Sequence, residues 1–278
     1  MTIENRARRY LAELLEARTG QQIAPARIWC IEITLRPLML ERGFASLDDL
    51  VAALMRNSDP ALADRVVEAL LNHETSFFRD HALFKQLETG GIERMRAARN
   101  GRLRIWSAGC STGQEAYSLA MLFANAPARW EGWAIEIHAT DVSGAAIGRA
   151  REGRYSRFEI QRGLPVNNML RWFDQEGDCW QVKPDLPQRI SFERQNLLES
   201  VTSVPPFDII LCRNVMLYFF PERRRSAFAR LAAAIAPDGC LMLGAGETIM
   251  GMTDAFLPES DNRGLYRRTT AACQTHAA

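Results

Sequence analysis

Residues 1–72 repeat apolar positions at helical spacing and show no strand-like alternation. The stretch YLAELLEARTG (10–20) places its apolar residues on one face of a helix that ends at a glycine. A second helix is expected over residues 26–42, kinked by Pro37. Ser46 is a candidate N-cap for a third helix, and SDPALADRVVEALL predicts a fourth. The N-terminal quarter is therefore predicted to be all helical.

The pattern changes from about Leu103 onwards. Short β-rich runs alternate with helical stretches, namely LRIWSAG, AIEIHATDV, ISFERQN, FDIILCRN and CLMLGAG. Strands that alternate with helices predict an α/β fold built on a doubly wound, mostly parallel sheet. RGLYRRT near the end is expected to add a last strand, antiparallel to its neighbour.

One stretch departs from this alternation. Residues 155–189 are expected to hold an extra helix, VNNMLRWF, followed by a small hairpin in GDCWQVKPDLPQRI. We interpret them as a small β-subdomain inserted between sheet elements. The predicted organisation is a helical domain over residues 1–72, a linker over 73–100, and an α/β domain over 101–278 that carries this insertion.

Charge and cysteine usage narrow the class of protein. A net charge of +1 gives no basic footprint for nucleic acid. The six cysteines are scattered and form no CxxC pair, which favours reduced thiols in the cytoplasm over disulfides or a zinc site, and no metal is expected. No signal peptide and no run of membrane-spanning length is visible. We expect a cytoplasmic protein without membrane insertion.

Ligands of open α/β sheets bind beyond the carboxyl ends of the strands. The first strand runs into SAGCSTGQEAYS, where Gly109 and Gly113 allow a tight turn and a close approach to a ligand. This GxxxG spacing is neither the dinucleotide GxGxxG pattern nor a phosphate loop. A turn glycine pair without any ligand remains the alternative.

Polar residues also end two other strands. Asp141 ends the second strand and can accept both hydroxyls of a ribose, or it can simply cap the next helix together with Ser143. Arg213 and Asn214 interrupt an apolar run, where burial is costly unless a ligand or a structural salt bridge pairs with them. A nucleoside site without a pyrophosphate suggests S-adenosylmethionine.

The chain is similar to a known family in several motifs. NHETSFFRD, IWSAGCSTGQEAYSLAM, HATDVS, RGLP, FERQNLLE and LCRNVMLYF, in this order and spacing, closely resemble the CheR family of chemotaxis-receptor glutamate O-methyltransferases. The resemblance covers nearly the whole chain. It implies a class I, Rossmann-like methyltransferase fold that uses S-adenosylmethionine and releases S-adenosylhomocysteine.

The resemblance also implies residue roles. Arg79 and Tyr218 would lie at the reaction centre, and Phe77 and Phe78 would wall the pocket. The family reads Asn-x-Thr where this chain has His73-Glu74-Thr75, so either His73 or Asn72 would touch the cofactor. The full set of cofactor contacts implied by the family is His73, Thr75, Arg79, Glu115, Asp141, Asn196, Leu197, Arg213 and Asn214.

The acceptor implied is a glutamate carboxylate on a receptor's cytoplasmic methylation helix. It is ionised at neutral pH and needs no general base. Arg27, Arg36 and Arg42 would grip that helix, and the compact DQEGDCWQV suggests independence from a receptor pentapeptide. The alternatives are a methyltransferase of the same scaffold acting on another signalling protein or a small acid, and a non-catalytic regulator that binds S-adenosylmethionine.

Overall fold

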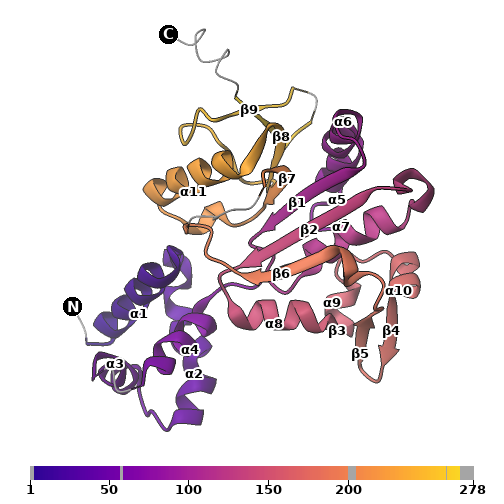
Figure 1. Ribbon diagram of the computed structural model, residues 1–278. Helices are drawn as coiled ribbons and strands as arrows, with labels where there is room; N and C mark the ends of the chain where they lie inside the picture. The colour runs from indigo at the N-terminus through magenta and orange to yellow at the C-terminus, as the bar shows by residue number, and fades with distance from the viewer. Residues whose placement is uncertain (1–2, 57–58, 200–204, 261, 270–278) are drawn as a thin grey trace. The chain divides into compact units, whose positions relative to one another are not determined.

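The computed structural model describes residues 3–56, 59–199, 205–260 and 262–269 (Figure 1). The chain divides into two compact units. The N-terminal unit consists of Met1–Asn72 together with Tyr218–Arg223, and the larger unit consists of His73–Leu217 together with Arg224–Ala278. Each unit is described separately below.

The N-terminal unit is helical. Its elements are α1 (Ile3–Thr19), the 3₁₀ helix η1 (Pro25–Cys30), α2 (Ile31–Arg42), α3 (Leu47–Arg56) and α4 (Pro60–Leu70). The single helix expected over 26–42 is thus a 3₁₀ turn followed by an α-helix, which Gly43 ends in a left-handed conformation. Ser46 accepts a hydrogen bond from Asp49 N, as its predicted N-cap role requires. The main chain of Gln22 donates to Tyr218 O and fastens the 218–223 segment to this unit.

The larger unit contains a seven-stranded sheet in the order β6-β2-β1-β7-β8-β10-β9. The strands are β1 (Arg102–Ala108), β2 (Ala134–Asp141), β6 (Ile190–Arg194), β7 (Phe207–Cys212), β8 (Ile235–Leu243), β9 (Phe256–Pro258) and β10 (Leu265–Arg268). The first five pair in parallel, whereas β10 is antiparallel to both of its neighbours. The predicted mostly parallel α/β sheet with an antiparallel last strand is confirmed.

Helices precede the first of these strands and connect the others. They are α5 (His81–Gln86), the π-helix η2 (Leu87–Ile92), α6 (Glu93–Ala98), α7 (Gln114–Ala124), the 3₁₀ turns η3 (Pro127–Trp130), η4 (Pro187–Arg189) and η5 (Met216–Tyr218), α8 (Gly144–Glu152) and α11 (Pro221–Ala234). α7 is apolar around most of its circumference and is almost entirely buried in the main hydrophobic core. No helix among the described residues is both long enough and apolar enough to cross a membrane.

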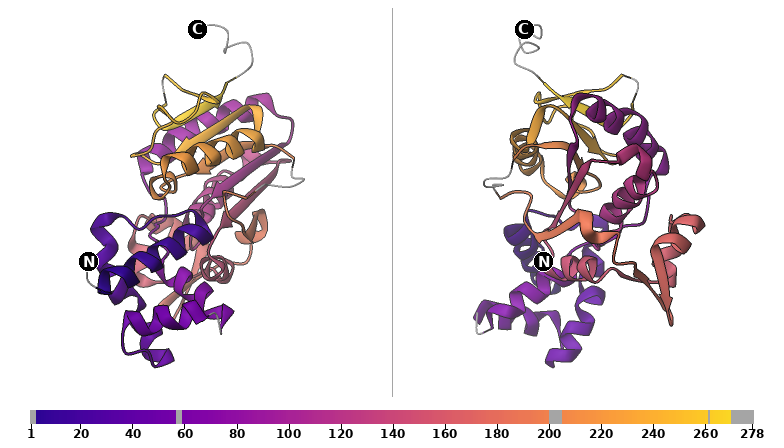
Figure 2. Two further views of the ribbon diagram at one scale, coloured as in Figure 1. Left: turned by 90° about the vertical axis from the view of Figure 1, so that its left-hand side faces the viewer. Right: turned by 45° about the vertical axis from the view of Figure 1, so that its right-hand side comes forward.

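The inserted region forms its own small sheet. β3 (Arg154–Ser156), β5 (Cys179–Val182) and β4 (Phe173–Glu176) pair antiparallel in that order, and α9 (Arg157–Gln161) and α10 (Val166–Trp172) lie between β3 and β4. Gly177 lies in the tight β4–β5 turn with φ +60°. Figure 2 shows the β4–β5 hairpin and α10 projecting from the larger sheet (salmon, right view).

The parallel strands place the candidate residues at one edge of the sheet. β6, β2, β1, β7 and β8 all end on the same side, because every adjacent pair among them is parallel. The strand order reverses between β1 and β7. The carboxyl ends flanking such a reversal are where open α/β sheets bind their ligands.

Candidate active site

The turn after β1 is a tight GxxxG loop. Gly109 has φ +81°, and a Cβ there would lie 2.4 Å from Val215 Cγ2, so only glycine fits. Gly113 has φ +94° directly before α7. Between the two glycines, Ser111 N donates to Asp141 Oδ2 at 2.8 Å. The ends of β1 and β2 are thereby joined.

Asp141 organises three loops. Besides Ser111 N, its carboxylate accepts a hydrogen bond from Ser143 N at 2.9 Å, and its main-chain oxygen accepts one from Gln195 N at 2.9 Å. Ser143 is the N-cap of α8 through its bond from Ala146 N. The capping role that the sequence left open between Asp141 and Ser143 therefore belongs to the serine.

Asn196 and Leu197 come directly after Gln195, whose N–H donates to Asp141 O. Asn196 Oδ1 accepts a hydrogen bond from Leu198 N, which closes a local turn, and the Leu197 side chain is buried. The structure therefore brings this loop beside the end of β2. The predicted bracketing of an adenine ring by these two residues stays a prediction.

The segment of residues 73–80, called the joining segment below, is fastened to the larger unit at several points. His73 O accepts a hydrogen bond from Ser111 Oγ at 2.9 Å. Phe78 N donates to Ser118 Oγ on α7 at 2.9 Å. Arg162, in the loop after α9, pairs with Glu74 at 3.1 Å. The segment thus lies against the turn after β1 and the first turns of α7.

The two phenylalanines of the joining segment have different surroundings. Phe77 is fully buried and makes edge-to-face contacts with Tyr155 and Phe173 of the inserted region, at 5.0 and 5.5 Å between ring centroids. It therefore anchors the segment in the core and does not line an open pocket, contrary to expectation. Phe78 is half-buried against Phe84 and is the one of the pair that remains partly accessible.

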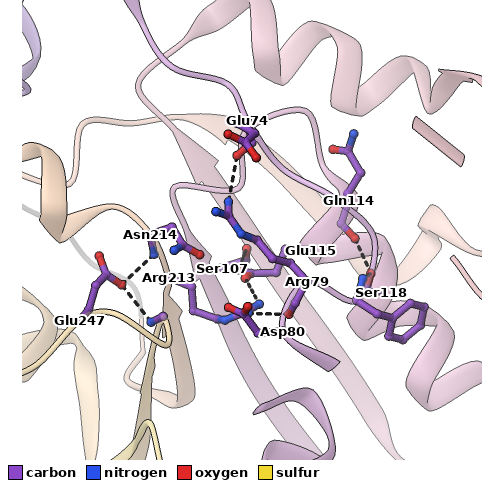
Figure 3. Close-up of polar contacts among 12 residues, drawn as sticks. Glu74, Arg79, Asp80, Ser107, Gln114, Glu115, Ser118, Arg213, Asn214 and Glu247 are labelled. Carbon is purple, nitrogen blue, oxygen red and sulfur yellow. Dashed lines mark hydrogen bonds and ion pairs between the residues drawn. The ribbon is translucent and has the colours of Figure 1, made fainter. Parts of the chain in front are cut away.

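Arg213 links the joining segment to α7. Its side chain is 1 % exposed and pairs with Asp80 at 2.9 Å and with Glu115 at 3.1 Å. It also donates to Arg79 O, while Ser107 Oγ donates to the other carboxylate oxygen of Glu115 (Figure 3). Two acids therefore compensate the buried guanidinium, as the cost of burying it requires. A structural salt bridge therefore does pair with this guanidinium, whereas its buried Nε has no partner among the described residues.

Asn214, the next residue, has a partner that no sequence motif singles out. Glu247, in the loop after β8, accepts hydrogen bonds from Asn214 N and Gly244 N through one oxygen and from Leu217 N through the other. Nothing in the sequence pattern indicates Glu247, because its partners are main-chain N–H groups.

Backbone strain gathers on these same segments. In the described part of the chain, the residues other than glycine with positive φ are Phe78, Asp80, Ser111 and Asn214. Such conformations cost on the order of 1–3 kcal/mol each and concentrate at functional sites. Two of the four lie in the joining segment and the other two in the loops after β1 and β7.

The thiols near these loops are unreactive. Burial, reinforced by Asp141 and Glu115, raises the pKa of Cys110 well above its ordinary value. Burial, reinforced by Glu247 and Glu115, does the same for the pKa of Cys212. Both remain protonated at neutral pH and are poor nucleophiles. Cys273 lies outside the described residues.

The remaining predicted residues are placed as follows. Arg79 is half-buried and donates to Glu74 O, within its own segment (Figure 3). Thr75 is half-buried in the same segment. Tyr218 belongs to the N-terminal unit, where its hydroxyl bonds to Asn72 Nδ2. Its predicted partnership with Arg79 stays a prediction.

Comparison with known families decides what this site belongs to. Residues 73–264 match the model of the CheR methyltransferase, SAM binding domain. The chain belongs to the CheR family. It is therefore an S-adenosylmethionine-dependent methyltransferase, and S-adenosylmethionine is its cofactor. The CheR match begins at His73, so it includes the whole joining segment as well as the strand-end loops.

Curated CheR relatives extend the similarity to nearly the full chain. The chain is 35% identical to "Chemotaxis protein methyltransferase Cher2" of Pseudomonas putida, over 87% of this chain and 90% of that protein. It is also 35% identical to "Chemotaxis protein methyltransferase 1" of Pseudomonas aeruginosa, over 91% and 94%. A protein of that same description from Vibrio cholerae is 32% identical over 95% and 97%.

Proposed function

We propose that this CheR protein transfers the methyl group of S-adenosylmethionine to glutamate side-chain carboxylates of chemotaxis receptors, forming glutamyl methyl esters. The observation that supports this most is the closed network of Arg213, Glu115 and Asp80, which ties the joining segment to the carboxyl ends of β1 and β7. The names of the curated relatives point to the same pathway.

The side chains at this edge fit the cofactor's chemistry. Glu115 is a carboxylate held by Ser107 and Arg213, suited to the ammonium of the methionine part. The Asp141 carboxylate is half-buried at the end of β2, where an acid suits ribose hydroxyls. Asn196 and Leu197 would bracket the adenine, and His73 or Asn72 with Thr75 would close the site from the joining segment. Arg213 would act indirectly, by holding the Glu115 carboxylate. The side-chain amide of Asn214 would contact the cofactor itself.

The reaction needs no general base from the protein. When bound, the cofactor supplies a methyl group on a positively charged sulfur. An ionised glutamate oxygen forms the new C–O bond while the C–S bond breaks and its electron pair remains on sulfur, so S-adenosylhomocysteine leaves as the product. No proton moves, since the acceptor is already a carboxylate near neutral pH. The buried, protonated thiols Cys110 and Cys212 offer no competing nucleophile.

Arg79 and Tyr218 would hold the acceptor in line with the methyl group. A guanidinium next to a carboxylate orients it by charge-assisted hydrogen bonds, and alignment is the main source of rate acceleration in such a transfer. Among the described residues the Arg79 side chain donates one hydrogen bond, to a main-chain oxygen of its own segment, so its other N–H groups are available to an acceptor.

The partner surface is proposed on α2 and η1, where Arg27 and Arg36 are exposed. Arg42 instead pairs with Asp59 at 3.2 Å. The inserted hairpin turns within two residues, between Glu176 and Cys179, and this compactness supports independence from a receptor pentapeptide. Titration calorimetry with a receptor C-terminal pentapeptide should detect no heat of binding, whereas micromolar affinity would refute this part.

The deciding experiment incubates the full-length protein with methyl-labelled S-adenosylmethionine and receptor cytoplasmic fragments. Base-labile label should appear on the fragment, as expected of a carboxyl ester, and should disappear when the methylated glutamates are changed to glutamine. Label that resists base, or that persists after Glu→Gln changes, would point to another acceptor. Binding of S-adenosylhomocysteine without any transfer would instead indicate a regulator.

Replacing Arg79 tests the proposed catalytic role. Arg79→Ala should lower kcat about 10- to 100-fold, the equivalent of one lost charge-assisted hydrogen bond. The Kd for S-adenosylhomocysteine, measured by calorimetry, should change less than about threefold. Arg162→Ala is the matched control, because Arg162 contacts the same segment only through the exposed Glu74. Normal turnover by Arg79→Ala would contradict the role.

A further inference from the structure

The loop after β8 is clamped to the loop after β7 by one carboxylate. Glu247 Oε2 accepts hydrogen bonds from Asn214 N at 2.7 Å (Figure 3) and from Gly244 N at 2.9 Å. Glu247 Oε1 accepts one from Leu217 N at 3.3 Å. Hydrogen bonds to an ionised acceptor are stronger than neutral ones. Glu247 therefore fixes the main chain on both sides of the turn that follows Arg213.

Gly244 permits this convergence. A Cβ on Gly244 would lie 2.9 Å from Glu247 Oε2 and 3.0 Å from Asn214 N. A side chain at this position would displace either the carboxylate or the backbone that it holds. The close packing of Gly244, Asn214 and Glu247 makes this a specific junction, distinct from an exposed acid that happens to reach a nearby amide.

Asn214 is the residue whose geometry the junction determines. It has φ +59°, a left-handed conformation that asparagine adopts more readily than most other residues, and the hydrogen bond from its N–H to Glu247 holds it in this conformation. Its side-chain oxygen Oδ1 is buried, and no donor among the described residues reaches it. A buried acceptor left unpaired costs about 1–3 kcal/mol, so its partner is expected from a ligand.

We propose that Glu247 is a positioning residue for the methyl transfer, which holds Asn214 so that its amide oxygen accepts a hydrogen bond from the bound cofactor. This rests on the proposed function. The donor is the ammonium group of the methionine part, because Asn214 directly follows Arg213, which holds the Glu115 carboxylate assigned to that group. Glu247 itself acts on main-chain groups and has no direct contact with the cofactor.

The test is a double-mutant cycle on cofactor affinity. Glu247→Gln, Asn214→Ala and the double variant are compared by calorimetric titration of full-length protein with S-adenosylhomocysteine. Gln keeps the size of Glu but presents an N–H₂ group to main-chain donors. Each single variant should weaken binding about tenfold, and the double variant should bind no worse than the weaker single one, because both remove the same contact. Glu131→Gln, an exposed acid outside the site, is the control.

Two outcomes would overturn the inference. The first is an unchanged affinity for S-adenosylhomocysteine in Glu247→Gln. The second is a double variant whose loss of affinity equals the product of the two single losses, because this would mean that Glu247 does not act through Asn214. Glu247→Asp keeps the negative charge and should recover part of the affinity for S-adenosylhomocysteine that Glu247→Gln loses. If Glu247→Asp unfolds at the same temperature as the wild type and yet recovers no affinity, the inference is also wrong. If the wild-type protein does not bind S-adenosylhomocysteine, the proposed function is refuted instead.

Discussion

The close approach of Gly163 to the joining segment shows how a single residue supports the site. Gly163 lies in the RGLP motif with φ +84°, and a Cβ there would come within 2.1 Å of Phe77 O. Phe77 in turn is the buried anchor of the joining segment. Position 163 therefore requires glycine for two reasons: its backbone is left-handed, and Phe77 O leaves no room for a side chain.

Gly163→Ala should accordingly cost about 3 kcal/mol of unfolding free energy, since it adds a backbone collision to the strain of a left-handed alanine. It should also weaken S-adenosylhomocysteine binding, because Phe77 must shift. Gly177→Ala is the matched control: its φ is +60°, but nothing lies within 4 Å of the added Cβ, so about 1 kcal/mol is expected. Urea unfolding of both variants checks this, and equal losses would contradict it.

Some individual residues of the site could be recognised from the sequence alone, and others could not. Arg213 stands out because a cation that interrupts an apolar run must find partners, and Asp80 and Glu115 supply them. Glu247 could not be found in this way, because main-chain donors leave no side-chain pattern. Phe77 was assigned to the pocket wall from the family motif, but the sequence does not reveal which of two adjacent phenylalanines faces the core.

At the scale of elements, the apolar runs predicted the central strands well, whereas they gave no prediction of the helices within residues 73–100. Residues 73–100 contain α5, the π-helix η2 and α6. Gly90 and Gly91 resemble helix breakers in the sequence, yet they lie inside η2, where a Cβ on Gly91 would come within 3.2 Å of Cys240 Sγ. Contact with a strand 150 residues away determines this helix, so local propensity could not predict it.

The end of α6 is tied to the sheet by one arginine, which gives a testable pH dependence. Arg99 pairs with the buried Asp208 at the start of β7 and with the exposed Asp238 in β8. Its hydrogen bond lowers the pKa of Asp238. A carboxyl whose folded pKa lies below its unfolded value of about 3.9 adds stability above that pH and loses it as the pH falls through the folded pKa.

Asp238→Asn should therefore cost less than about 1 kcal/mol near pH 7, because the carboxylate is 55% exposed. The difference from wild type should begin to shrink as the pH falls below about 4 and should vanish only below the lowered pKa of folded Asp238. Arg99→Ala should cost more, about 3 kcal/mol, because it leaves the charge of Asp208 buried without its cation. Urea unfolding at pH 7 measures both costs, and a series of measurements at decreasing pH below 4 follows the loss of the Asp238 contribution. Equal losses at pH 7 would show that Asp208 does not depend on Arg99.

At the scale of the whole molecule, the parallel strands explain why distant motifs form one site. The loops after β1, β2, β6, β7 and β8 are spread over more than a hundred residues, yet they share one edge because these strands run in the same direction. Strand alternation in the sequence predicts this edge. It does not predict how each loop is fastened, because contacts such as Ser111 to Asp141 depend on the three-dimensional register.

At this scale we predict that binding of the proposed acceptor and binding of the cofactor can be altered separately, because Arg36 lies in a different unit from the cofactor's carboxylates. Arg36 is exposed on α2 and makes no ion pair within the described part of the chain, whereas Arg42 is already paired with Asp59. If the N-terminal unit grips an acidic receptor helix, Arg36→Glu should raise the KM for receptor fragments about tenfold at low salt. The effect should shrink as ionic strength rises, because exposed charges are screened over roughly 10 Å at 0.1 M salt.

The Kd for S-adenosylhomocysteine should stay unchanged in Arg36→Glu, since every carboxylate assigned to the cofactor lies in the larger unit. Arg263→Glu, which makes the same charge change on an exposed residue of that larger unit, should leave both constants as they are. An equal rise in KM for the two variants would mean that net charge, and not this helix, governs the encounter. A KM unaffected by Arg36→Glu even at low salt would place the receptor contact elsewhere on the molecule.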